Sequence, residues 1–153
     1  MILGDTDFLA QEEAQVRVLV VDDEVASQII MKSILNSHCC VDVASNGLEA
    51  VEFFVQSLND KRPYDLIFMD IIMPEMDGQE ALRSIRRIEK ENKIDKLKET
   101  AVVMLTILDD PKSVVEAYHS GGAIFYLTKP ATRQVIEEVV NDLGSTNKFK
   151  LVL

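Results

Sequence analysis

The sequence lacks long apolar runs, and none approaches the ~20 residues that a membrane-spanning helix needs. Its first residues, 1–15, are acidic and do not follow the basic-then-apolar order of a signal peptide. We therefore expect no contact with a membrane and a cytoplasmic location.

Basic residues are also few. The chain has 16 Lys and Arg against 26 Asp and Glu, which gives a formal net charge of -10. Proteins that bind nucleic acid directly need a basic surface, because their Lys and Arg side chains displace counterions from the phosphates. We therefore expect no direct contact with nucleic acid.

Cysteine and histidine are scarce as well, with two residues of each. Cys39 and Cys40 are adjacent in a predicted strand, where neighbouring side chains point to opposite faces, so they suit neither a disulfide framework nor a metal site. We expect both to be small buried or half-buried residues. His38 is predicted to be a surface turn residue, and His119, on a predicted helix, is given no role.

The chain does have a regular alternation of strand and helix patterns over 153 residues, of which 47% are hydrophobic. This fits one domain, placed at residues 16–144 between tails of residues 1–15 and 145–153. The alternation predicts an α/β fold with a parallel five-stranded sheet covered by helices on both faces. Strands are predicted at 16–21, 41–44, 66–70, 101–105 and 123–127, and helices at 25–37, 46–58, 111–120, 131–143 and from 78 onward.

Apolar residues at helical spacing predict which helix faces are buried. The first predicted helix has Ile30, Met31, Ile34 and Leu35, and the last has Val135, Val139, Val140 and Leu143. The stretch 83–99 mixes basic and acidic residues, which is typical of a solvated helix and loop.

Polar side chains gather where the predicted strands end. Asp22 and Asp23 follow the first strand, Asp70 ends the third, Thr106 ends the fourth and Lys129 follows the fifth. In a parallel sheet these ends share one edge, where ligands bind in open α/β folds. We therefore expect the five side chains to converge.

Three carboxylates packed together repel one another, and a hard divalent cation resolves that conflict. Oxygen ligands in an incomplete protein cage favour Mg²⁺, which often binds phosphate oxygens as well. The Lys129 charge and the Thr106 hydroxyl then suit a phosphoryl group, which an Asp carboxylate can accept as an acyl phosphate. Each feature also has an ordinary interpretation, because Asp-Asp-Glu can simply open a helix, Thr106 end a strand and Lys129-Pro130 form a turn.

Four segments carry a closer resemblance. They are Val20-Val21-Asp22-Asp23-Glu24, Met69-Asp70-Ile71-Ile72-Met73-Pro74-Glu75-Met76-Asp77-Gly78, Leu105-Thr106 and Tyr126-Leu127-Thr128-Lys129-Pro130. With these segments the chain resembles a response-regulator receiver domain of two-component signalling, of the chemotaxis-regulator type. The resemblance implies a flavodoxin-like fold, a (βα)5 three-layer sandwich with strand order 2-1-3-4-5.

The resemblance also implies a site, with Asp70 as the phosphoacceptor. The implied Mg²⁺ ligands are the carboxylates of Asp23 and Asp70, the backbone carbonyl of Ile72 and, through water, Asp22. Lys129 and Thr106 would bind the phosphoryl oxygens. The family often has a cis bond before the matching proline, so we expect a cis Lys129-Pro130 bond. We expect no enzyme activity beyond the protein's own phosphorylation and dephosphorylation.

A switch and partners are implied too. Phosphoryl oxygens would draw the Thr106 hydroxyl inward, and Tyr126, which matches the family's switch aromatic, would rotate into the vacated space. The alternative for Tyr126 is a half-buried strand aromatic without a switching role. The output face would be residues 111–120, 123–127 and 131–143, which an unidentified downstream protein or a second copy in a homodimer would cover. The expected phosphoryl donor is a sensor histidine kinase or a histidine phosphotransfer protein.

Some residues depart from the family pattern. Ile107 stands where the family usually has a small residue, and its branched side chain is predicted to narrow the approach to Asp70. Ile72 and Leu108, two positions after Asp70 and Thr106, cannot orient a hydrolytic water by hydrogen bonding. This predicts a long-lived phosphoryl group.

A second departure lies before the fifth predicted strand. Gly121-Gly122 adds one residue there, and Ile124 and Phe125 stand where many relatives are polar. Both residues are interpreted either as core or as an apolar patch on the output face.

Three function classes remain open. The first is a stand-alone receiver, because no residues follow Leu153 to build a DNA-binding output domain. The second is a phosphate-independent pseudo-receiver that only binds partners, against which the complete set of site residues argues. The third is a phosphatase with an aspartyl nucleophile, similar to haloacid-dehalogenase-like enzymes, which typically needs a second acid where Ile72 stands and a capping insertion that is not visible here.

Overall fold

A computed structural model describes residues 15–107 and 125–145 of the 153-residue chain. The strands are β1 (Val16–Val21), β2 (Cys39–Ala44), β3 (Leu66–Asp70), β4 (Ala101–Thr106) and β5 (Phe125–Thr128). The helices are α2 (Val25–Leu35), α3 (Gly47–Asn59), α4 (Gly78–Glu91), the short 3-10 helix η1 (Lys96–Lys98) and α6 (Arg133–Ser145). Among these helices none is long and apolar enough to cross a membrane.

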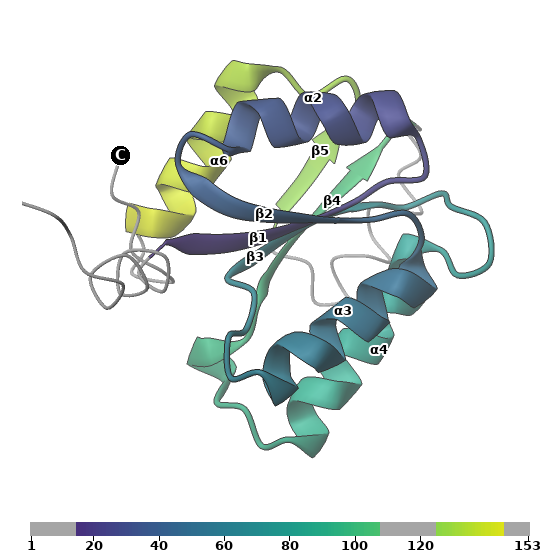
Figure 1. Ribbon diagram of the computed structural model, residues 1–153, viewed down its shortest axis with the longest axis vertical. Helices are drawn as coiled ribbons and strands as arrows, with labels where there is room; N and C mark the ends of the chain where they lie inside the picture. The colour runs from purple at the N-terminus through teal and green to yellow at the C-terminus, as the bar shows by residue number, and fades with distance from the viewer. Residues whose placement is uncertain (1–14, 108–124, 146–153) are drawn as a thin grey trace, which may run out of the picture.

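The five strands form one parallel sheet in the order β2-β1-β3-β4-β5 (Figure 1). This confirms the predicted fold class and the strand order 2-1-3-4-5. Since all strands run in the same direction, their carboxyl ends share one edge, with β1 and β3 adjacent at the centre.

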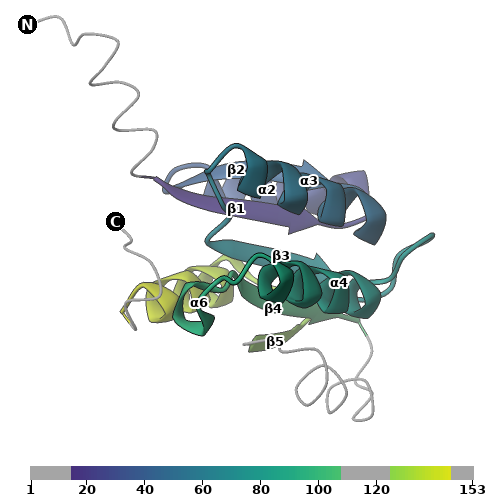
Figure 2. The ribbon, with the colours of Figure 1, turned by 90° about the horizontal axis from the view of Figure 1, so that it is seen from below.

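Helices cover both faces of the sheet, with α2 and α6 on one side and α3 and α4 on the other (Figure 1). Figure 2 shows the strands one after another in their sheet order. Side chains of each strand alternate between the two cores: in β3, Leu66 and Phe68 pack under α2 and α6, whereas Ile67 and Met69 pack under α3 and α4. Burial on both faces explains the continuous apolar runs in the sequence. Full burial of a side chain such as Phe68 contributes about 2 kcal/mol to folding.

Polar side chains cap the N-termini of α3 and α4, the two helices that share one face of the sheet. The Asn46 side chain accepts a hydrogen bond from the Glu49 N–H at 2.8 Å at the start of α3. The Asp77 side chain accepts one from the Glu80 N–H at 2.9 Å at the start of α4. Each carboxylate or amide oxygen satisfies a backbone N–H that has no partner within the helix.

Some boundaries differ from the predicted ones. β2 begins at Cys39, earlier than predicted, because Cys39 pairs with Val16 of β1. α6 begins after Thr132, whose hydroxyl oxygen accepts a hydrogen bond from the Val135 N–H at 3.3 Å, and it continues to Ser145.

Two residues predicted to face the core are exposed instead. Ile30 of α2 is 58% exposed, while its neighbour Met31 is buried. Val135 of α6 is 36% exposed, and Ile136 takes the buried position. Both exposed residues lie at the edge of an apolar stripe, and the sequence does not show which edge of such a stripe reaches solvent.

Several predicted features lie outside the described residues. They are the helix at 111–120 with His119, the residues Leu108, Gly121, Gly122 and Ile124, and the tail residues 1–14 and 146–153. Phe125 begins β5, but its side chain is not described.

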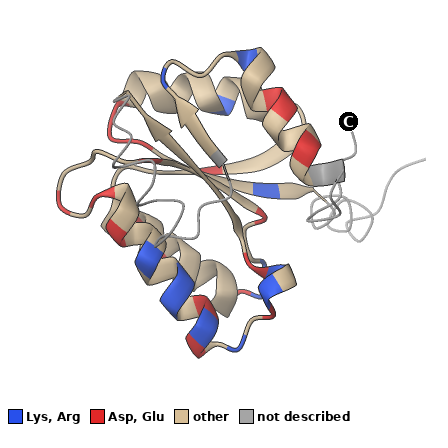
Figure 3. Cartoon of the chain, turned by 180° about the vertical axis from the view of Figure 1, so that it is seen from behind, with Lys and Arg blue, Asp and Glu red and all other residues tan. Residues whose placement is uncertain are grey.

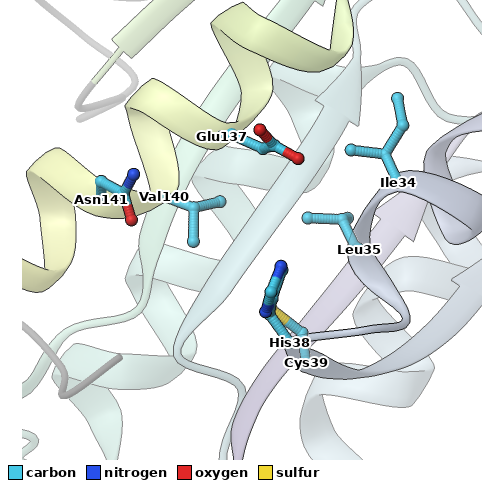
Figure 4. A pocket seen from close by; sticks show the side chains of 7 residues that line it. All are labelled: Ile34, Leu35, His38, Cys39, Glu137, Val140 and Asn141. Atoms are coloured by element: carbon cyan, nitrogen blue, oxygen red, sulfur yellow. The ribbon is translucent and has the colours of Figure 1, made fainter. Parts of the chain in front are cut away.

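Both cysteines lie at the start of β2 as free thiols, Cys39 buried and Cys40 half-buried, as predicted. Figure 4 shows Cys39 beside His38 at one end of a groove between α2 and α6. His38 lies in the turn after α2, where its N–H donates to the Leu35 carbonyl at 3.1 Å, and it is half-buried. Burial, with smaller contributions from Asp65 and Cys40, raises the pKa of the Cys39 thiol to about 11.

A buried carboxylate, Glu89, joins the end of α4 to the start of β4 and is 1% exposed. Its Oε1 lies 2.7 Å from Arg86 Nη1, and its Oε2 accepts a hydrogen bond from the Thr100 N–H at 2.8 Å. Most residues of 83–99 are exposed or half-buried, and Figure 3 shows charges of both signs along this segment, so Glu89 is an exception in a mostly solvated helix and loop. Burial raises the pKa of Glu89, and Arg86 and the Thr100 N–H offset only part of that shift.

Glu89→Gln tests the cost of this buried charge. The raised pKa means that the contribution of Glu89 to stability is full below its ordinary pKa of 4.5 and is lost as the pH rises through the folded-state value. Gln resembles the protonated acid and does not titrate. We therefore expect the stability of Glu89→Gln relative to that of wild type to increase as the pH rises above the ordinary Glu pKa of 4.5, measured as free energies of unfolding in urea.

Glu91→Gln is the matched control, because Glu91 lies on the exposed part of the same helix. An equal pH-dependent gain in both variants would show that net charge, and not burial at Glu89, is responsible.

Candidate functional site

β1 and β3 end side by side and bring three carboxylates to the same edge of the sheet. Asp22 and Asp23 directly follow β1, and Asp70 is the last residue of β3. Asp22 and Asp70 are buried, at 1% and 8% exposed, whereas Asp23 is exposed. One carboxylate oxygen of each lies within 4.8 Å of those of the other two. The structure thus brings the three acids of the sequence prediction together in one acidic cluster.

Lys129 links two members of the acidic cluster. Its Nζ lies 2.7 Å from Asp22 Oδ2 and 3.2 Å from Asp70 Oδ2. Its backbone N–H donates to the Thr106 carbonyl at 2.7 Å, which holds the end of β5 against the end of β4. The Lys129-Pro130 peptide bond is cis, which confirms that prediction.

Burial and charge act in opposite directions on the two central groups. Burial raises the pKa of Asp70, and the Lys129 ammonium offsets only part of that rise. Burial lowers the pKa of Lys129, but hydrogen bonds and charges from Asp22 and Asp70 outweigh it, so this pKa is raised. Lys129 therefore keeps its proton, and its positive charge is available to an anionic group at the site.

The chemistry of the acidic cluster fits a hard divalent cation. Three carboxylates face one ammonium group, so a negative excess remains when all three are ionised. The Glu24 N–H donates to Asp22 Oδ1 at 2.9 Å, which fixes the orientation of that carboxylate. The available donors are oxygen atoms, which Mg²⁺ prefers, and water would complete its octahedral shell.

The loop after Asp70 is packed tightly against the starts of α3 and α4. A Cβ atom at Gly78 would overlap the Asp70 carbonyl oxygen, and one at Gly47 would overlap the Met76 carbonyl oxygen. Both positions therefore need glycine because the backbone approaches so closely. Ile72 lies in this loop, and its backbone forms a hydrogen bond with the Asp70 carboxyl group that lowers the Asp70 pKa.

Thr106 and Tyr126 occupy neighbouring strands at the same edge. Thr106 is buried at the end of β4, next to Leu105, which pairs with Asp70. Tyr126 of β5 pairs with Met104 of β4. Its half-buried side chain packs against the core under α3 and α4, which also contains Met104. Since side chains alternate along β4, Thr106 lies on the same face of the sheet as Met104 and Tyr126.

Several aliphatic side chains on α2 and after β3 and β4 are exposed, and the sequence did not predict them as one surface. We call the following five exposed residues the aliphatic rim: Val25, Ile29 and Ile30 on α2, Ile72 after β3 and Ile107 after β4. Ile30 and Ile107 line the same cavity as Asp22 and Lys129. Ile107 is 69% exposed and Ile72 is 51% exposed. Val25 and Ile29 lie one turn apart on α2 and are exposed, whereas Ile34 and Leu35 are buried. The four-residue spacing of Val25 and Ile29 could have identified this apolar surface in the sequence.

Comparisons with known proteins agree with this geometry. The profile of the response regulator receiver domain matches residues 18–141. The probable transcriptional regulator ycf29 of Porphyra purpurea is 36% identical over 126 residues, which cover 82% of this chain and 54% of that protein. The chemotaxis protein CheY of Bacillus subtilis (strain 168) is 33% identical over 127 residues, which cover 82% of this chain and 94% of that protein.

A solved complex gives a structural counterpart. It contains the histidine phosphotransfer signaling protein Ypd1 of Saccharomyces cerevisiae and the receiver domain of its downstream response regulator Ssk1. The matched chain is 30% identical with a TM-score of 0.75, and the match covers 90% of this chain and 94% of that one.

The relatives differ in length. This chain spans 54% of the Porphyra protein and only 8% and 12% of two histidine kinases that it also matches. The family profile nevertheless covers most of the chain, including the three clustered acids and Lys129. The chain therefore belongs to the response regulator receiver domain family, the flavodoxin-like signalling modules of two-component systems.

Proposed function

We propose that this receiver accepts a phosphoryl group on Asp70 from the phosphohistidine of a sensor histidine kinase or a histidine phosphotransfer protein. The observation that carries the proposal is the position of Lys129 Nζ, 2.7 Å from Asp22 and 3.2 Å from Asp70 in a cluster that also includes Asp23. A nucleophile, a set of cation ligands and a fixed positive charge lie together there. The similarity to the receiver domain solved with Ypd1 supports a donor of this kind.

In the proposed reaction, a carboxylate oxygen of Asp70 attacks phosphorus while the phosphorus–nitrogen bond of phosphohistidine breaks and the imidazole takes the electron pair. Lys129 and Thr106 would contact the oxygens of the transferred group. The fixed ammonium stabilises negative charge that spreads over those oxygens in the transition state. The reaction changes the receiver itself, so the protein acts on no other substrate.

The proposed reaction depends on Mg²⁺, which supplies additional positive charge at the transferred group when bound. The acidic cluster would hold it through Asp23 and Asp70, with the Ile72 carbonyl as a third ligand and Asp22 acting through water. The negative excess of the acidic cluster and its oxygen donors support this assignment.

Thr106 and Tyr126 form the proposed switch. Their location on one face of the sheet supports it, because a Thr106 hydroxyl drawn toward a phosphoryl group leaves space on the side where Tyr126 packs. The proposed output face is that of residues 111–120, 123–127 and 131–143. A downstream protein or a second copy on that face stays a prediction, as do action in the cytoplasm and action without an attached output domain.

The aliphatic rim is the surface that we propose for the phosphoryl donor protein. Exposed aliphatic side chains grouped on one surface mark protein contacts more often than single ones do. A donor that presents its phosphohistidine to Asp70 must cover the residues around the acidic cluster, and these include Ile72 and Ile107.

The first test follows intact mass after incubation with Mg²⁺ and acetyl phosphate. We expect wild type to gain one phosphoryl group and Asp70→Asn to gain none, because the amide is not a nucleophile for phosphorus. Asp77→Asn is the matched control, since Asp77 lies in the loop after β3 and caps α4, a role that Asn also fills. If wild type gained nothing from either acetyl phosphate or a phosphorylated kinase, the protein would be a pseudo-receiver.

The second test separates donor docking from chemistry through Ile29→Asp. We expect transfer from a phosphorylated histidine phosphotransfer protein, with Ypd1 as the first probe, to slow by about tenfold or more, as for loss of an apolar contact in an interface centre. Phosphorylation by acetyl phosphate should be unchanged. Leu97→Asp is the control, because Leu97 is exposed at the opposite edge of the sheet. Equal slowing by both variants would contradict the proposed surface.

The third test addresses the lifetime of the phosphoryl group. We expect slow self-dephosphorylation of wild type, because the exposed Ile72 side chain offers no hydrogen bond to an attacking water. Ile72→Asn should accelerate it by about tenfold, below the usual contribution of a positioned acid–base group. Loss of label is followed over time, with Leu97→Asn as the control. Wild-type hydrolysis as fast as that of short-lived chemotaxis regulators would contradict the prediction.

A further inference from the structure

A cavity of about 280 Å³ opens beside the acidic cluster, between α2 and the segment that follows β5. Its walls are mainly apolar: Ile30 and Met31 of α2, Leu105 and Ile107 at the end of β4, and Ala131 before α6. Asp22 and Lys129 also line it and form a polar end. The cavity therefore combines aliphatic walls with one pair of opposite charges.

The polar end of the cavity adjoins Asp70. Lys129 Nζ, which lines the cavity, lies 3.2 Å from Asp70 Oδ2. A donor whose phosphorus faces Asp70 and whose phosphoryl oxygens face Lys129 therefore has its remaining atoms near the cavity. Ile107 and Ile30 are 69% and 58% exposed, so their side chains extend the apolar walls toward solvent.

We propose that this cavity binds the acyl group of acyl phosphates and favours short aliphatic chains such as butanoyl over acetyl. This rests on the proposed function, because it names a class of small donor for Asp70. Asp70 carboxylate attacks phosphorus, the bond from phosphorus to the acyl oxygen breaks, and the carboxylate of the fatty acid leaves with the electron pair. The sum of charges is conserved, and no further reactant is needed.

Both ends of such a donor match the cavity. The phosphoryl oxygens are anionic and face the Lys129 ammonium, which keeps its proton. The hydrocarbon chain lies against Ile30, Met31 and Ile107, where each fully buried methylene strengthens binding by about fourfold. The carboxylate that leaves carries a negative charge next to Asp22 and the phosphoryl group now on Asp70, whose repulsion favours its release.

The test compares phosphorylation rates with acetyl phosphate and butanoyl phosphate at equal, subsaturating concentrations in the presence of Mg²⁺. We expect wild type to react at least about threefold faster with butanoyl phosphate, because its two extra methylenes are partly buried. Ile107→Ala should lower this ratio to about one, since the outer wall of the cavity is lost. Leu97→Ala is the control: Leu97 is an exposed aliphatic residue of η1 that does not line the cavity, so the wild-type ratio should persist.

Binding without transfer gives a second measurement. Butylphosphonate, whose phosphorus cannot be transferred, should shift the methyl NMR signals of Ile30 and Ile107 and leave that of Ile29 in place, whereas methylphosphonate should shift none of the three. The rate with phosphoramidate, which has no acyl group, relative to the rate with acetyl phosphate should be the same in wild type and Ile107→Ala.

The outcomes are distinguishable. A butanoyl-to-acetyl ratio that is the same in wild type, Ile107→Ala and Leu97→Ala would overturn the cavity proposal and leave the proposed function intact. A ratio of one in wild type would also overturn the cavity proposal, even where Ile107→Ala slows transfer from a phosphotransfer protein, because Ile107 belongs to the aliphatic rim as well. No phosphorylation by any of these donors or by a phosphorylated kinase would contradict the proposed function itself.

Discussion

The acidic edge of this sheet depends on the ion pairs that the Lys129 ammonium group makes with two carboxylates. Two buried carboxylates, Asp22 and Asp70, lie within hydrogen-bonding distance of its Nζ. Without that charge both would lie uncompensated in a place that water reaches poorly, which costs several kcal/mol. One ammonium group cannot balance three carboxylates, of which Asp23 is exposed. The acidic cluster is therefore short of positive charge and suits a metal cation, while Lys129 suits an anionic group.

Close packing of backbone against backbone holds the loops at this edge of the sheet in place. The loop that carries Ile72 has no room for a side chain at Gly78 or Gly47, because the backbone of one segment lies directly against the backbone of another. At the opposite edge of the sheet, where β4 begins, the buried carboxylate of Glu89 joins the end of α4 to the Thr100 backbone. At the edge that carries Lys129 lie the exposed side chains of the aliphatic rim and the cavity behind Ile107.

Much of the fold was predictable because its signals are local. Strands buried on both faces appear as apolar runs, and Asn46 and Asp77 cap helices whose starts are readable in the sequence. The failures are equally specific. Ile30 and Val135 were assigned to the core although they are exposed, and Glu89 was assigned to a solvated segment although it is buried. In each case the residue type and spacing were correct, but burial depends on which element packs against the helix, and that information is not local.

The sequence by itself determined the α/β class, the strand order through the family resemblance, and the identity of the polar residues at the strand ends. Only the tertiary structure decided how these residues meet. Lys129 is 107 residues from Asp22 and 59 residues from Asp70 along the chain, so no local pattern sets distances of 2.7 and 3.2 Å between them. Those distances result from the order in which the parallel strands pair. The aliphatic rim and the cavity lie where the helices do not cover the edge of the sheet. Packing sets both, since side chains far apart in the sequence share a site only after the sheet has formed.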